Sequence, residues 1–549
     1  MLARAYAARG VDSEDALQVG VGALATFETL GGVDAATGIL AEAIERDERI
    51  LIVGDYDADG ATSTALMVRA LGAMGAKQVS YLVPNRFEDG YGLSPAIVDA
   101  ARSFQPQVLV TVDNGISSLD GVAYARERGI RVVVTDHHLP GAELPTADAI
   151  VNPNLPGDAF PSKSLAGVGV AFYLLAALRA HLSRAGWFER VSLKAPKMAQ
   201  WLDLVALGTV ADVVPLDHNN RILVHQGLAR IRAGQCCPGI SALLSVGKRD
   251  PRNAVAADLG FAVGPRLNAA GRLNDMTIGI ECLLTDQPQA AASIAASLDD
   301  LNAERRQLEV QMTGQAEQAV ADLRLGAHLP EALALFESDW HAGVVGIVAS
   351  RVKDRVHRPV VAFAKDGDGW LKGSARSVEG VHIKDAIELV AARNPGLIQK
   401  FGGHAMAAGM TIAESAFDTF AKELARVVKD IVGSQGLKVR VLSDGCLDPA
   451  DRSMAVADLI KQAGPWGQRF PEPQFDDVFE VLEQRIVGGS HLKLILGCAA
   501  SGRRFDAIAF GLGDQHPCPN TIRAVYRLDI NQFRGATTLQ LLVQHIEPA

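Results

Sequence analysis

The chain has 549 residues, of which 48% are hydrophobic and 5% aromatic, and its formal net charge is −10 at pH 7. This length exceeds what one hydrophobic core can organise, and it predicts roughly three or four domains. Residues 1–12 lack a signal-peptide pattern, no run of about 18 apolar residues occurs, and six scattered cysteines fit neither a disulfide framework nor a zinc site, so we expect a cytoplasmic protein without a membrane segment.

The first part of the chain alternates short β-branched apolar runs with longer amphipathic stretches, which is typical of strand-helix units around a mostly parallel sheet. We predict a helical extension over residues 1–48 and an α/β domain over residues 49–285. The predicted strands are 50–53, 108–112 and 132–135, and the predicted helices are 62–75, 119–129 and a buried one at 198–209.

A helical linker is predicted over residues 286–325, which begin with an Asp cap and Pro288 and contain one glycine. As one unbroken helix it would span about 55 to 60 Å, a spacer length rather than a core length. Two helices in series are the alternative.

Two further domains are predicted after the linker. A second α/β unit occupies residues 326–432, with strands at 332–336, 360–364 and 409–412. Residues 433–549 contain a series of short strands separated by glycine and polar turns, which suits a small β-barrel. These strands are predicted at 439–442, 478–486, 492–496, 506–510, 524–528 and 539–546.

Aspartates end three of the apolar runs in the first α/β domain, at Asp55, Asp113 and Asp136. Because the carboxyl ends of parallel strands open on one crevice, we expect these side chains to converge. Asp57 and Asp59 follow Asp55 at alternate positions, so an extended backbone would project all three from one face. Asp212, just past the buried helix, would complete a metal site.

Carboxylates with one or two imidazoles favour Mn²⁺ or Mg²⁺ over zinc. Residues 55–60 also match the start of a calcium-binding EF-hand loop, but its twelfth position would be Leu66 instead of a bidentate Glu. A phosphate-binding P-loop needs a Lys after the glycine, which is absent here. Any single Asp could cap a turn or helix, so it is the combination of four clusters that indicates a metal site.

These four clusters resemble the motifs of the DHH phosphoesterases, which include RecJ nucleases, family II inorganic pyrophosphatases and oligoribonucleases. The similarity to RecJ nucleases extends through the strings at residues 83–93, 264–272 and 464–468. The resemblance implies that two Mn²⁺ or Mg²⁺ ions are held by Asp57, Asp59, Asp113, His137 and Asp212, with Asp113 bridging.

The resemblance also implies supporting roles for Asp55 and His138 in catalysis and for Asp136 behind the ligands. This chain has Val53 where some relatives carry a histidine, which implies weaker binding of the first ion, with Asp55 helping to hold it.

The second α/β unit resembles the DHH-associated domain through residues 373–377 and 402–409. A Gly-Gly pair permits close backbone approach to an anion, and an arginine offers a fork for phosphate oxygens, although small residues there could merely let a strand pack. The resemblance implies that Ser374, Arg376, Gly402 and Gly403, with Arg86, hold a 5′-terminal phosphate, and that His404 faces the scissile bond. The C-terminal segment resembles an oligonucleotide-binding OB barrel.

Residues 221–272 contain eight Lys or Arg against two Asp or Glu, so we expect Arg266 and Arg272 to line a DNA channel between the two α/β domains. The resemblance implies a monomeric 5′-to-3′ exonuclease that degrades single-stranded DNA to mononucleotides in repair and recombination, together with a single-stranded-DNA-binding protein and a helicase. The alternatives are a DHH hydrolase for pyrophosphate, short oligonucleotides or cyclic dinucleotides, and a non-catalytic single-strand-binding scaffold.

Overall fold

The computed structural model describes residues 1–85, 92–324, 329–367, 369–433, 436–499, 501–533 and 535–549. The chain forms two compact units. The first comprises Met1–Gly271, Asp275–Asp299 and Val441–Ala549, and the second comprises Arg272–Asn274 and Asp300–Arg440. Within the described residues, no helix is long and apolar enough to cross a membrane.

The first unit opens with α1 (Leu2–Ala8) and α2 (Val33–Glu45), followed by a five-stranded sheet whose pairs are all parallel. Its order is β2-β1-β3-β4-β5, and the predicted strands β1, β3 and β4 are confirmed. The strands are β1 (Ile50–Val53), β2 (Val79–Leu82), β3 (Val108–Val112), β4 (Arg131–Thr135) and β5 (Ala149–Val151), with α3 (Ala58–Ala73), α4 (Pro95–Ala101) and α5 (Leu119–Glu127) between them. Every residue of β1 and β3 is buried, as expected for a central parallel strand.

A helical region follows the sheet in the same unit. Its first long helix, α6 (Gly167–Arg184), packs against α3, and α8 (Leu202–Ala211) packs against both. The predicted helix at 198–209 begins instead as a 3₁₀ turn at Met198–Trp201, before α8. The remaining helices are α7 (Trp187–Arg190), α9 (His218–Arg232), α10 (Pro238–Val246), α11 (Ala256–Asp258), the π-helix η7 (Leu259–Val263), α12 (Gly264–Leu273) and α13 (Thr277–Leu284).

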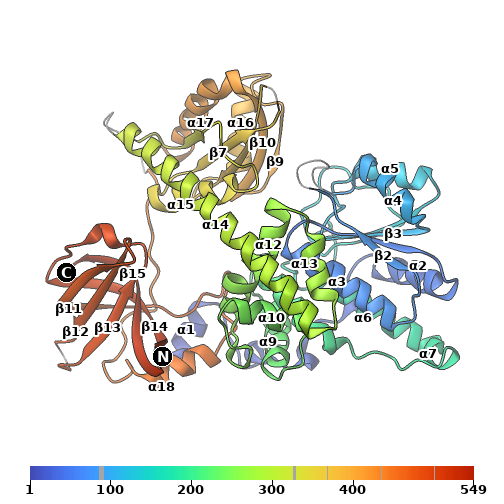
Figure 1. Ribbon diagram of the computed structural model, residues 1–549, viewed down its shortest axis with the longest axis horizontal. Helices are drawn as coiled ribbons and strands as arrows, with labels where there is room; N and C mark the ends of the chain where they lie inside the picture. The colour runs from blue at the N-terminus through green and yellow to red at the C-terminus, as the bar shows by residue number, and fades with distance from the viewer. Residues whose placement is uncertain (86–91, 325–328, 368, 434–435, 500, 534) are drawn as a thin grey trace. The chain divides into compact units, whose positions relative to one another are not determined.

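The predicted linker is one continuous helix, α14 (Pro288–Arg324), of 37 residues (Figure 1). Its second half belongs to the second unit, where it packs with α15 (Val345–Val356) on one face of a mixed sheet of order β6-β7-β8-β10-β9. Helices α16 (Ile383–Arg393) and α17 (Phe417–Val432) cover the other face. The strands are β6 (Leu333–Phe336), β7 (Val360–Lys365), β8 (Trp370–Arg376), β9 (Lys400–Gly403) and β10 (Ala407–Ala413).

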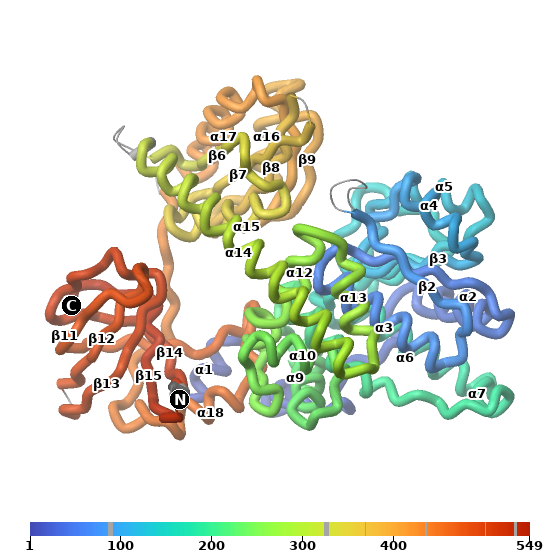
Figure 2. The backbone as a smooth tube through the Cα atoms, viewed as in Figure 1, coloured from blue at the N-terminus to red at the C-terminus, as the bar shows by residue number. Residues whose placement is uncertain are grey.

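The C-terminal segment forms α18 (Met454–Gln462) and a closed five-stranded barrel of order β11-β12-β13-β15-β14, whose path can be followed in Figure 2. The predicted barrel is therefore confirmed. The predicted strand at 439–442 is wrong, because that segment has no strand partner and Val439 and Leu442 are exposed. The barrel strands are β11 (Phe475–Val487), β12 (His491–Gly497), β13 (Arg504–Ala509), β14 (Thr521–Phe533) and β15 (Ala536–Pro548).

Candidate metal centre

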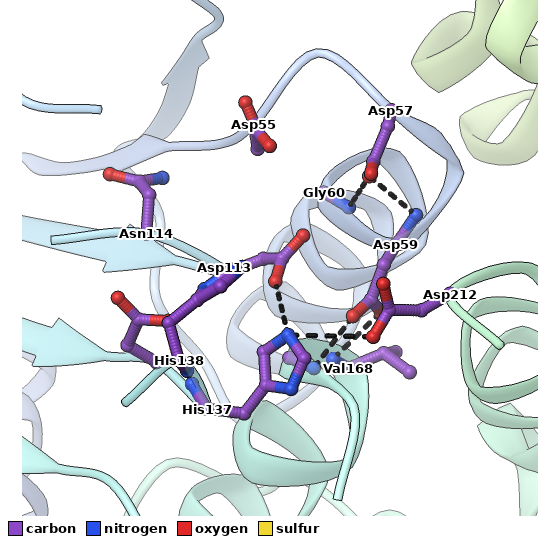
Figure 3. Close-up of polar contacts among 12 residues, drawn as sticks. Asp55, Asp57, Asp59, Gly60, Asp113, Asn114, His137, His138, Val168 and Asp212 are labelled. Carbon is purple, nitrogen blue, oxygen red and sulfur yellow. Dashed lines mark hydrogen bonds and ion pairs between the residues drawn. The ribbon is translucent and has the colours of Figure 1, made fainter. Parts of the chain in front are cut away.

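The three strand-ending aspartates lie at the carboxyl edge of the parallel sheet, as the sequence predicts. Asp113 and Asp136 directly follow β3 and β4, and Asp55 comes two residues after β1. Since β1, β3 and β4 are neighbours in the sheet, the three buried aspartates lie at the same edge of it. Figure 3 shows Asp55 and Asp113 with the other labelled residues of the site. The topology alone accounts for this convergence of residues far apart in the sequence.

Asp57 and Asp59 reach the cluster by a different route from the one predicted. The extended backbone ends at Asp57, which is the N-cap of α3 and whose carboxylate accepts the N–H groups of Asp59 and Gly60 at 2.9 and 3.0 Å, so the expected extended geometry is wrong at Asp59. Asp59 therefore lies in the first turn of α3. Its carboxylate accepts the N–H groups of Gly167 and Val168, at the beginning of α6, at 2.6 and 3.0 Å.

Asp212 and His137 complete the cluster. Asp212 is the C-cap of α8, and His137 follows Asp136 after β4. His137 Nε2 lies 3.1 Å from an oxygen of Asp113 and 3.4 Å from an oxygen of Asp212. All five residues predicted to bind metal are thus brought together.

Ligand atoms of three overlapping groups lie within 4.8 Å of one another in the described residues. One group is Asp59, His137 and Asp212, the second is Asp55, Asp57 and Asp113, and the third is Asp113, His137 and His138. Because Asp113 and His137 each belong to two groups, the arrangement suits two neighbouring cations that share ligands. Asp55 lies among the possible ligands, and its help in compensating for Val53 stays a prediction.

The carboxylates destabilise one another without a cation. Burial, reinforced by the charges of Asp59 and Asp57, raises the pKa of both Asp113 and Asp212 well above its usual value. Burial and the charge of Asp57 raise the pKa of Asp59 to about 7. A cluster that holds this much negative charge out of water calls for a positive partner, and divalent cations with oxygen ligands supply one.

His137 provides a second test of whether a metal fits. Burial, with the neighbouring His138, lowers the pKa of His137 to about 4, so its ring is neutral at pH 7. The backbone of Leu165 opposes this shift and raises the pKa of His137 in part. The ring nitrogen Nε2 is buried without a hydrogen bond among the described residues and faces carboxylate oxygens. A lone pair that faces oxygens needs a cation between them, and the donor set fits Mn²⁺ or Mg²⁺.

Asp136 and His138 form an ion pair behind these groups. The carboxylate of Asp136 is 2.7 Å from His138 Nδ1 and also accepts the N–H groups of Ile116, His137 and His138. Burial alone would raise the pKa of Asp136, but the hydrogen bond and charge of His138 lower it. Burial would likewise lower the pKa of His138, and Asp136 raises it instead. These contacts engage both carboxylate oxygens of Asp136, which favours an orienting role for this residue.

Several supporting residues were missed by the sequence reasoning. A Cβ added at Gly167 would lie 2.6 Å from Asp113 Cβ, and one at Gly208 would lie 2.7 Å from an oxygen of Asp59. Asn114 donates to the carbonyls of Val53 and Val112, which ties the ends of β1 and β3 together. Asn268 accepts the N–H of Ala58 at 2.8 Å. The sequence offers only weak signals for them: Asn114 directly follows Asp113, and Asn268 lies in the string at 264–272 that resembles RecJ nucleases.

The residues predicted to bind phosphate lie in the second unit. Register places Ser374 of β8 opposite Gly409 of β10, which is opposite Gly402 of β9. Arg376 donates to Ser374 Oγ at 3.1 Å, and a Cβ at Gly346, in the first turn of α15, would be 2.9 Å from both side chains. Gly403 has a φ of 145°, and His404 follows it in the turn to β10.

The predicted DNA-contacting arginines are engaged with the protein itself. Arg266 is buried, forms an ion pair with Asp299 at 2.7 Å and donates to the carbonyl of Ala262. Arg272 donates to the carbonyl of Gly343 at 3.0 Å. These contacts favour structural roles for both side chains. Arg86 lies outside the described residues.

Comparisons with known proteins agree with this architecture. The DHH family N-terminal domain matches residues 49–209, the DHHA1 domain matches 329–430 and the RecJ OB domain matches 443–545. The single-stranded-DNA-specific exonuclease RecJ of Dickeya dadantii is 53% identical over 100% of this chain and 96% of its own length.

Two solved structures extend the similarity to the fold. RecJ of Thermus thermophilus in complex with Mn²⁺ has a TM-score of 0.79 and 31% identity, covering 100% of this chain and 76% of that one. Its complex with Mg²⁺ has a TM-score of 0.75 and 29% identity, covering 100% and 74%. The chain therefore belongs to the RecJ family, within the wider DHH family.

Proposed function

We propose that this protein is a metal-dependent exonuclease that hydrolyses single-stranded DNA. The observation that carries the proposal is the sharing of Asp113 and His137 between overlapping groups of ligand atoms. Relatives named as single-stranded-DNA-specific exonucleases match the whole chain, and a related fold is known with Mn²⁺ and with Mg²⁺. Phosphodiester hydrolysis is the reaction for which a paired-cation site is best suited.

In this proposal, Asp57, Asp59, Asp113, His137 and Asp212 hold the two cations, and Asp55 assists them. The bound ions would supply an activated water and neutralise the charge that builds on the phosphate. Asp136 raises the pKa of His138 through the 2.7 Å ion pair, which favours an imidazolium that could donate a proton or a hydrogen bond to the reacting phosphate.

We further propose that digestion begins at a 5′ end and proceeds by release of mononucleotides. The support lies in the second unit, where Arg376 and Ser374 adjoin Gly346 in the first turn of α15. A helix N-terminus, a guanidinium fork and a hydroxyl together form a favourable environment for a terminal phosphate. Gly402 and Gly403 at the end of β9 would let the backbone approach this phosphate closely. In the same proposal, Arg86 also contacts the terminal phosphate and His404 faces the scissile bond.

The biological setting is also part of the proposal. A single-strand-specific nuclease acts in DNA repair and recombination in the cytoplasm, where a helicase must expose its substrate and a single-stranded-DNA-binding protein covers it. We propose that the enzyme works as a monomer, and that the C-terminal barrel guides the strand, because OB barrels commonly bind single strands through stacking and backbone contacts.

Digestion of end-labelled oligonucleotides tests the function. The purified protein is given single-stranded and duplex DNA, labelled at either end, with a 5′ phosphate or a blocked 5′ end, in Mn²⁺, Mg²⁺ or chelator. We expect labelled mononucleotide to appear first from the 5′ label, only with metal, and only from the single strand. Activity that persists in chelator, or equal release from both ends, would contradict the metal dependence or the polarity respectively.

A further inference from the structure

One aromatic side chain, on a turn that packs against α8, is exposed instead of being packed into the core. Phe261 is 80% exposed, whereas its neighbours Leu259, Ala262 and Val263 are buried. It lies on η7, a single π-helical turn from Leu259 to Val263. Such wide turns are rare in proteins and occur frequently at functional sites. Leaving a phenyl ring in water has a cost in free energy that a ligand contact would offset.

The turn η7 lies close in the fold to a candidate metal ligand. A Cβ added at Gly260 would lie 3.2 Å from Val210 Cγ1, and one at Gly264 would lie 3.3 Å from the Cβ of Ala211. The turn therefore packs directly against the end of α8, whose next residue is the candidate ligand Asp212.

The residue after Asp212 is also unusual. Val213 is 62% exposed and has a φ of 61°, a backbone conformation that a β-branched residue adopts only under constraint. Strain of this kind is concentrated at functional sites. Phe261 and Val213 are thus both exposed, the first on a turn that packs against the end of α8 and the second directly after Asp212.

Three arginines near η7 in the sequence are paired with carboxylates. Arg249 pairs with Asp258 at 3.1 Å, Arg252 with Asp250 at 2.9 Å, and Arg266 with Asp299. Within residues 221–272, where the sequence predicts DNA-contacting arginines, η7 therefore exposes an aromatic side chain on a turn that packs against α8.

We propose that the ring of Phe261 stacks on a base of the single strand close to the scissile phosphate, with Val213 contacting the same nucleotide. This inference rests on the proposed function and makes Phe261 a positioning residue. A phenyl ring can stack on any base, so it would hold a strand of any sequence, and an unpaired base offers it a free face, whereas the bases of a duplex are stacked on each other. Phe261 would thereby contribute to the preference for single strands.

Abasic substrates test the stacking directly. Steady-state rates are measured with Mn²⁺ on 5′-phosphorylated single strands that are intact or carry one abasic site at each of the first several positions. We expect Phe261→Ala to lower kcat/KM about tenfold on the intact strand, mainly through KM, since stacking on one base contributes about that factor. When the abasic site is at the position that stacks on Phe261, kcat/KM of the unaltered enzyme should fall to a similar degree. The Phe261→Ala variant should cut that abasic strand as fast as it cuts the intact strand. Phe261→Trp should restore the intact-strand rate.

The control is Phe104→Ala, because Phe104 is partly exposed on the short 3₁₀ turn that precedes β3, at the opposite end of the sheet strand from Asp113. It should leave both rates unchanged. The inference is overturned if Phe261→Ala matches the unaltered enzyme, or if its loss is equal on intact and on every abasic strand, which indicates a packing role. If the unaltered enzyme fails to cut single strands at all, the proposed function itself fails, so the two outcomes are distinguishable.

Discussion

The two α/β sheets of this protein gather groups of opposite charge. In the first, all strand pairs are parallel, and the carboxyl edge collects Asp55, Asp113 and Asp136. In the second, β8, β10 and β9 are antiparallel, and the edge where β8 ends brings Arg376 to the start of α15. Strand direction decides which residues meet. In a parallel sheet, the carboxyl ends of neighbouring strands lie at one edge, so the residues that follow them gather there. In the mixed sheet, the end of one strand lies beside a turn and a helix N-terminus.

The sharpest way to break this comparison is to remove a shared acidic group. Asp113→Asn keeps the side-chain shape and tolerates the φ of 62° at this position. We expect kcat to fall by about a thousandfold or more, because both candidate ion positions lose a charged ligand. Release of nucleotides from a labelled single strand in Mn²⁺ measures the effect.

The thermal stability of the metal-free protein provides the control for Asp113→Asn. Burial and neighbouring carboxylates raise the pKa of Asp113, so its charge destabilises the metal-free protein at neutral pH. In chelator, the Tm of Asp113→Asn should equal or exceed that of the unaltered protein. A large drop in Tm would mean that the variant loses activity by misfolding.

The next largest effect should come from filling the space behind the acidic cluster. A Cβ at Gly167 would overlap Asp113, so Gly167→Ala should displace the carboxylate and lower activity by about a hundredfold, with Tm reduced as in other overpacked cores. Gly38→Ala is the matched control, since Gly38 lies inside α2 with no neighbour within 4 Å of an added Cβ. It should retain activity and gain slightly in Tm. Equal behaviour of the two variants would refute the packing argument.

Removing the charge that orients His138 should have an intermediate effect. In Asp136→Asn, the ion pair is lost and His138 loses the partner that raises its pKa. We expect kcat/KM and the apparent affinity for Mn²⁺ to fall by about 10- to 100-fold, as is usual for groups that position ligands. A metal titration of the rate separates the two quantities, and unchanged values for both would exclude the orienting role.

The smallest expected effect concerns Arg376, at the end of β8 in the second sheet. Arg376→Ala should lower kcat/KM about tenfold on strands with a 5′ phosphate and leave strands with a 5′ hydroxyl unchanged, because only the phosphate engages the guanidinium. Arg376→Lys should recover part of the loss, since it keeps the charge without the fork. An equal loss on both strands would show that Arg376 supports the fold and does not recognise the end.

The fold and the acidic cluster were predictable because they depend on local pattern. Buried runs of β-branched residues predict β1, β3 and β4, and strand direction then brings their terminal aspartates together. The extended geometry expected for Asp57 and Asp59 fails at Asp59 because a helix cap competes with a strand ending, and the capping N–H groups of Asp59 and Gly60 decide the outcome.

Contacts between distant segments were not predictable. The burial of Arg266 against Asp299 and the close approach of Gly167 to Asp113 depend on how helices pack, which no spacing in the sequence reveals. The apolar segment at 439–442 has strand composition but finds no partner strand, and β-propensity without a partner has little predictive value.

The hydrogen bonds that hold Asp59 also bear on how the protein acquires its ions. Its carboxylate accepts two main-chain N–H groups of α6, and the carboxylate of Asp57 accepts two of α3. A coordination sphere that is preorganised in this way loses little conformational entropy on loading. We therefore expect removal of the ions with chelator to leave the native secondary structure in place, in contrast to small domains that fold only around their metal.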